Sequence, residues 1–126
     1  FWYHARDKAM CSEDAASLRK ERLNGVLQRL IPEIASKYQP EKIILFGSLA
    51  DGRVSAYSDI DLALVKRTQA PYCERILELL KLIHEDDGEP VDYFVYTPEE
   101  LKFETEHNPF VREEIVRKGK VLYDVS

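Results

Sequence analysis

The sequence is poor in the features that mark secreted, membrane-spanning and nucleic-acid-coating proteins. Its 126 residues contain only two cysteines, Cys11 and Cys73, which we interpret as free thiols in a reducing cytoplasm rather than a disulfide framework. No apolar run approaches the roughly 18 residues of a transmembrane helix, and no signal-peptide pattern opens the sequence. The formal net charge of −5 argues against a large nucleic-acid surface. The composition therefore indicates a cytoplasmic protein without membrane contact.

The chain also lacks internal repeats, low-complexity segments and linkers, which favours a single domain over residues 1–126. Hydrophobic periodicity and capping signals predict the elements in chain order. We expect a helix over 12–38, with Ser12 as N-cap and Pro32 as a kink or break. A second helix is expected over 71–88 with Pro71 at its first position, a third after Thr97, and a fourth from Asn108 to Gly119. Strands are expected over 43–46, 60–65, 91–96 and 121–123. This alternation predicts an α/β (α+β) fold, a small mixed β-sheet flanked by helices.

The most informative segment is residues 42–65, KIILFGSLADGRVSAYSDIDLALV. Asp59 and Asp61 stand two residues apart at the start of an apolar strand, so their side chains share a face about 6.6 Å apart along it. That spacing suits a hard divalent cation, which prefers oxygen ligands. The turn at Gly47 and Ser48 offers backbone N–H groups and a hydroxyl to a phosphate chain. A phosphate cradle beside a cation chelate suggests phosphoryl or nucleotidyl transfer. The alternative is that Asp59 caps a turn and Asp61 is a solvated edge residue.

Gly-Ser followed by Asp-x-Asp resembles the signature of the DNA polymerase β-like nucleotidyltransferase superfamily, and the resemblance runs from about residue 41 to 124. It implies a catalytic core over 41–124 behind an N-terminal helical extension over 1–40. It also implies ATP as donor, two Mg²⁺ ions held by Asp59, Asp61 and a third carboxylate, Asp92, and a role for Asp92 in activating the incoming hydroxyl. Many relatives carry Arg directly after Gly-Ser; Leu49 stands there in this chain, and Arg53 is our candidate for the missing phosphate charge.

Among these enzymes the chain is most similar to the small stand-alone minimal nucleotidyltransferases, which implies a partner that presents the hydroxyl. Such proteins are commonly paired with a helical HEPN-domain toxin, and the resemblance implies an antitoxin that adds AMP to a tyrosine of that partner. Two alternatives stay open. One is a binding module that neutralises its partner by contact alone, and the other is an enzyme acting on a small molecule or an RNA end.

Overall fold

The computed structural model describes residues 2–83 and 88–126, and the side chains of residues 14–83 and 88–126. The helices are α1 (Trp2–Lys37), the short α2 (Ser48–Asp51), α3 (Tyr72–Leu82), α4 (Pro98–His107) and the π-helix η1 (Val111–Arg117). The strands are β1 (Lys42–Phe46), β2 (Ile60–Val65), β3 (Val91–Tyr96) and β4 (Lys120–Asp124). The predicted bounds of β2 and β3 are confirmed to the residue.

The strands form one mixed sheet in the order β3-β2-β1-β4. Strand β1 runs antiparallel to both β2 and β4, whereas β2 and β3 run parallel. Five of the six residues of β2 are buried, as expected of a strand with neighbours on both sides and cover on both faces. The predicted small mixed sheet flanked by helices is therefore confirmed, and the N-terminal ends of β2 and β3 lie at the same edge.

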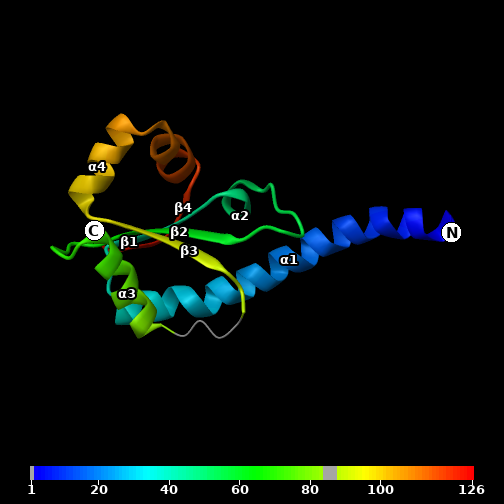
Figure 1. Cartoon of the computed structure of the whole chain (residues 1–126), viewed down its shortest axis with the longest axis horizontal. Helices are drawn as coiled ribbons and strands as arrows, with labels where there is room; N and C mark the ends of the chain where they lie inside the picture. Colours follow the sequence, from blue (N-terminus) through cyan, green and yellow to red (C-terminus); the bar gives the residue numbers. More distant parts are fainter. Residues whose placement is uncertain (1, 84–87) are drawn as a thin grey trace.

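Helices cover both faces of the sheet (Figure 1). On one face α1 and α3 pack on alternate residues of the strands. Burial of each large side chain in this core contributes about 2 kcal/mol. The core residues include Leu23, Leu30, Ile34, Ile43, Ile60, Leu62, Leu64 and Leu79. On the other face α4 and η1 cover a smaller cluster of Ile44, Phe46, Ala63, Val111 and Ile115. Because Asp61 precedes Ala63 by two residues, it belongs to this second face.

The first helix differs from the prediction at its start. It begins at Trp2 rather than at Ser12, because residues such as Ala5 and Lys8 favour helix intrinsically even without an apolar stripe. Its N-terminal half extends beyond the sheet (Figure 1). The helix also continues through Pro32. The flanking Leu30 and Ile34 are 2% and 0% exposed, so their burial outweighs the hydrogen bond that proline removes.

The later helices follow their capping signals with small shifts. Thr97 and Glu100 form the predicted capping box. Asn108 accepts a hydrogen bond from the Phe110 backbone N–H at 3.0 Å, and the helical segment that follows is a π-helix ending at Arg117. Pro71 is the N-cap of α3 rather than its first residue. The predicted end of α3 at 86–88 is wrong, since α3 ends at Leu82; Asp86 and Asp87 themselves lie outside the described residues.

The buried face of α3 also differs from the predicted apolar stripe. Leu80 was assigned to the stripe but is 38% exposed, whereas Arg75 is only 6% exposed. The Arg75 guanidinium is satisfied by the carbonyl of Val95 at 3.1 Å and by the carboxylate of Glu100 at 2.6 Å. This ion pair ties α3 to the start of α4.

No helix among the described residues is long and apolar enough to cross a membrane.

Candidate active site

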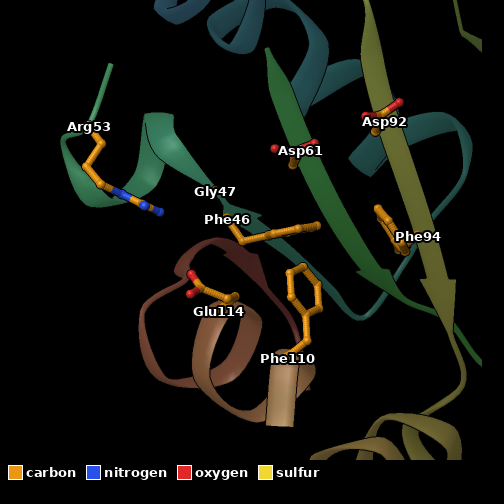
Figure 2. Close-up of a pocket in the computed structure, with 8 residues that line it drawn as sticks. All are labelled: Phe46, Gly47, Arg53, Asp61, Asp92, Phe94, Phe110 and Glu114. Carbon is orange, nitrogen blue, oxygen red and sulfur yellow. The ribbon is translucent and has the colours of Figure 1, made fainter. Parts of the chain in front are cut away.

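Two of the three predicted acids come together at the N-terminal ends of the parallel strands. Asp61 of β2 and Asp92 of β3 are register partners, so their Cα atoms lie on neighbouring strands about 4.8 Å apart in the hydrogen-bonding direction. Figure 2 shows both carboxylates at the same end of the sheet, on adjoining strands. The chain thus places two acidic side chains against each other on a half-buried surface.

The environment of Asp61 disfavours its charged form. The pKa of Asp61 is raised from 3.8 to about 6, first because burial removes water from the carboxylate. The negative charges of Asp92 and Asp59 raise the pKa further, and so does a hydrogen bond between the Asp61 and Asp92 carboxyl groups. A cation placed between these carboxylates would relieve the repulsion that now raises the pKa.

Gly47 is required by the position of Asp61. It follows the last residue of β1, Phe46, which pairs with Asp61 across the sheet. Its backbone angles are φ 81° and ψ −161°, a region that only glycine adopts readily. A Cβ atom on Gly47 would lie 2.5 Å from Oδ2 of Asp61. The absence of a side chain at Gly47 therefore leaves the space that the carboxylate occupies.

A cavity of about 350 Å³ opens beside the two acids. Figure 2 shows its lining, with an aromatic group next to the carboxylates and the side chains of Arg53 and Glu114 further along the cavity; the lining residues are Phe46, Gly47, Arg53, Asp61, Asp92, Phe94, Phe110 and Glu114. The rings of Phe46 and Phe94 meet edge to face at a centroid distance of 5.5 Å. The site thus combines acids, an apolar floor and one cation.

The predicted phosphate-binding residues lie at or next to this cavity. Arg53 lines it and is 68% exposed, while its Nε donates to Asp51 at 2.8 Å. The Ser48 hydroxyl is hydrogen-bonded to the Ser58 hydroxyl at 3.0 Å, which ties the Gly-Ser turn to the segment before β2. Leu49 is 5% exposed and belongs to the core. Arg53 therefore supplies the cation of this turn, since Leu49 contributes only packing.

The third predicted acid, Asp59, faces a different partner. Its side chain is 48% exposed and pairs with Nη2 of Arg19 on α1 at 3.5 Å. Among residues 14–83 and 88–126, no group of three or more His, Cys, Asp or Glu side chains is arranged to hold a metal ion. The structure therefore brings Asp61 and Asp92 together, and it holds Asp59 near them in an ion pair with Arg19. The donor chemistry still suits Mg²⁺, which binds through one or two carboxylates plus substrate phosphates.

Sequence reasoning missed several residues of this site. Arg19, Phe94, Phe110 and Glu114 carry no local motif, and only the folded chain brings them near the acids. Phe94 had a usable signal, because it follows Asp92 by two residues on the same strand and therefore shares its face. The side chains of Arg19 and Glu114 come from α1 and η1, and no spacing in the sequence links those helices to β2.

Comparisons with known proteins agree with this geometry. The sequence profile of the family described as "Polymerase beta, Nucleotidyltransferase" matches residues 28–126. A crystal structure of a candidate nucleotidyltransferase from Sulfolobus solfataricus is similar over 87% of both chains, with a TM-score of 0.62 and 20% sequence identity. At that identity the structural likeness shows the fold alone. No curated protein gives a significant match.

Proposed function

The chain belongs to the polymerase β nucleotidyltransferase family, and on that premise we propose that it transfers AMP from ATP to a hydroxyl group of a partner protein. The observation that carries the proposal is the pair Asp61 and Asp92, side by side on parallel strands in a cavity that begins at Gly47. Mutually repelling carboxylates on a partly buried surface cost stability, and such pairs with a perturbed pKa in a cavity are typical of functional sites. Here they stand next to a turn and an arginine suited to phosphates.

The residues of the cavity divide into distinct roles. The backbone N–H groups that follow Gly47 and the guanidinium of Arg53 bind the triphosphate. The acceptor oxygen forms a bond to the α-phosphorus while the bond to the bridging oxygen breaks, and pyrophosphate leaves. Asp92, which is exposed at the mouth of the cavity, accepts the proton of the hydroxyl. Most of the rate enhancement comes from positioning and charge neutralisation.

Asp61 and Asp92 would hold Mg²⁺, with Asp59 as a third ligand once its carboxylate turns from Arg19. Bound Mg²⁺ neutralises charge on the phosphates and on the leaving group. The raised pKa of Asp61 fits this assignment, because burial and then the negative charge of Asp92 disfavour the Asp61 carboxylate, and a bound cation would favour it.

The acceptor is proposed from the resemblance to the minimal nucleotidyltransferases and from the aromatic lining of the cavity. We propose that a tyrosine of a HEPN-domain partner enters the cavity, where the half-exposed ring of Phe110 gives an aromatic acceptor a surface to pack against. The pair would then act as a toxin–antitoxin system, in which AMPylation silences the partner.

The principal alternative is a protein that silences its partner by contact alone. Incubating the chain with ATP, Mg²⁺ and the HEPN-domain product of a neighbouring gene separates the two. Transfer predicts a mass increase of one or more AMP units on the partner, located on tyrosine by fragmentation. Asp92→Asn should stop the modification while the two proteins still bind, because contact between the proteins does not depend on the carboxylate that accepts the proton. Full silencing by this variant without any modified partner would refute transfer and favour contact. Labelling of a small molecule or RNA end instead of the protein would overturn the acceptor assignment.

A further inference from the structure

Arg19 connects three places around the acid site. Its Nε donates to the backbone carbonyl of Ser58 at 2.8 Å, and its Nη2 lies 3.5 Å from Oδ1 of Asp59. Its Nη1 forms an ion pair with Glu89. The Arg19 side chain is 18% exposed and that of Glu89 is 8% exposed. All three arms of the guanidinium are therefore engaged, two of them with residues directly before β2.

The partners of Arg19 precede the two strands that carry the acids. Ser58 and Asp59 lead into β2, and Glu89 stands two residues before β3. Through these contacts a single side chain of α1 links the starts of both parallel strands, where Asp61 and Asp92 are register partners. A buried carboxylate such as Glu89 needs a partner charge, so the Arg19–Glu89 pair is a firm anchor for the guanidinium.

The contacts of Arg19 with the β2 side differ in length. The bond to the Ser58 carbonyl, at 2.8 Å, is a well-formed hydrogen bond, whereas the 3.5 Å approach to Asp59 is a looser ion pair. The carboxylate of Asp59 can thus leave Arg19 for a cation without breaking the link to the backbone. Arg19 also lies outside residues 28–126, the part matched by the family profile, so the family signature does not include it.

We propose that Arg19 is a positioning residue of the acid site: it fastens the segment before β2 to the segment before β3 and so holds Asp59 beside Asp61 for cation binding. The inference rests on the proposed function for the cation, and on the contacts alone for the fastening. A restrained ligand binds a metal more tightly than a mobile one, and loss of an outer partner typically costs about 10–100-fold in metal affinity.

Binding of Mn²⁺ to the purified chain, followed by electron paramagnetic resonance without nucleotide, tests the cation part. Arg19→Ala should weaken Mn²⁺ binding by about 10-fold or more, and Arg19→Lys should recover part of it, since lysine keeps the charge but not the fork. Arg22→Ala is the matched control, because Arg22 lies on the same helix and also pairs with Glu89; it should change Mn²⁺ affinity little. Equal or tighter binding by Arg19→Ala, or an equal loss in Arg22→Ala, would overturn the proposal.

A double variant tests whether Arg19 strengthens Mn²⁺ binding through Asp59. In an Asp59→Asn background, adding Arg19→Ala should weaken Mn²⁺ binding no further, because the restrained carboxylate is already absent. An undiminished loss in that background would show that Arg19 acts through general packing, against the proposal.

Hydrogen exchange without metal tests the fastening independently of function. Arg19→Ala should speed amide exchange in residues 55–59 clearly more than Arg22→Ala does, because the Ser58 anchor is lost. Wild-type exchange rates there in Arg19→Ala would refute the fastening. If the wild-type chain binds no Mn²⁺, the cation part of this proposal fails, whereas the proposed transfer is tested by its own experiment and this comparison still decides whether Arg19 restrains the segment.

Discussion

Replacing Gly47 by alanine tests why a glycine stands beside the acids. Two separate costs follow from the structure. The backbone at φ 81° and ψ −161° is a conformation that costs a residue with a Cβ on the order of 1–3 kcal/mol. The new Cβ would also lie 2.5 Å from Oδ2 of Asp61, so the carboxylate must move. We expect Gly47→Ala to lower the free energy of unfolding by at least about 2 kcal/mol.

Two other glycines provide matched controls. Gly52 has φ 86° and ψ 4°, and a Cβ there would meet no atom within 4 Å. Gly52→Ala should therefore cost only the left-handed conformation, about 1 kcal/mol. A Cβ on Gly25 also meets nothing within 4 Å, and Gly25 lies inside α1, so Gly25→Ala should stabilise by about 0.5–1 kcal/mol. The expected order of stability is Gly25→Ala, wild type, Gly52→Ala, Gly47→Ala.

Urea unfolding measures this order, and a double-mutant cycle isolates the contact. In an Asp61→Ala background the carboxylate is gone, so Gly47→Ala should lose the part of its cost that comes from the 2.5 Å approach and keep the backbone part. Transfer activity of Gly47→Ala should fall by about 100-fold, because the displaced Asp61 no longer faces Asp92. A Gly47→Ala variant as stable as Gly52→Ala would refute this explanation of the glycine.

Two further predictions concern charge. The pKa of Asp61 rises from 3.8 in the unfolded reference to about 6, so between these pH values the folded state binds more protons and stability falls as pH rises. Without divalent cations, the free energy of unfolding of Asp61→Asn should exceed that of wild type by about 1–2 kcal/mol near pH 7, after allowance for solvent screening, and equal it near pH 4. Thermal melts that show the same difference in stability at both pH values would contradict the raised pKa of Asp61 as its cause. Glu100→Gln should destabilise by about 2 kcal/mol, because it removes the negative charge from the buried guanidinium of Arg75, which keeps its hydrogen bonds to the backbone carbonyls of Ala70 and Val95. Arg117→Ala, which breaks the exposed pair with Glu113, should leave the midpoint of urea unfolding almost unchanged.

The predictable part of this molecule is local in sequence. Short, largely apolar runs defined β2 and β3 to the residue, because the pattern of a strand is contained in about six consecutive residues. The capping box at Thr97 needed only four residues. The resemblance to the nucleotidyltransferase superfamily implied that Asp61 and Asp92 serve one site, and in the structure the two residues are register partners on parallel strands.

The remainder depends on contacts between segments far apart in the chain. Arg75 can be buried because the carboxylate of Glu100, 25 residues later in the chain, neutralises its charge. No pattern within α3 predicts such a partner. The pairing of Asp59 with Arg19 spans two elements in the same way. The start of α1 was predicted wrongly for a different reason. A helix that extends beyond the core needs no apolar stripe, so the absence of hydrophobic periodicity before Ser12 did not mean that the helix began there.

The most direct test of nucleotidyl transfer follows the two ends of ATP separately. The chain, Mg²⁺ and the proposed HEPN-domain partner are incubated with ATP labelled either on the α-phosphate or on the γ-phosphate. Our account predicts α-label on the partner, γ-label in released pyrophosphate, no transfer in the presence of a chelator, and none by the folded double variant Asp61→Asn with Asp92→Asn. Label from the γ-phosphate on the partner, or undiminished α-label transfer by the double variant, would contradict it.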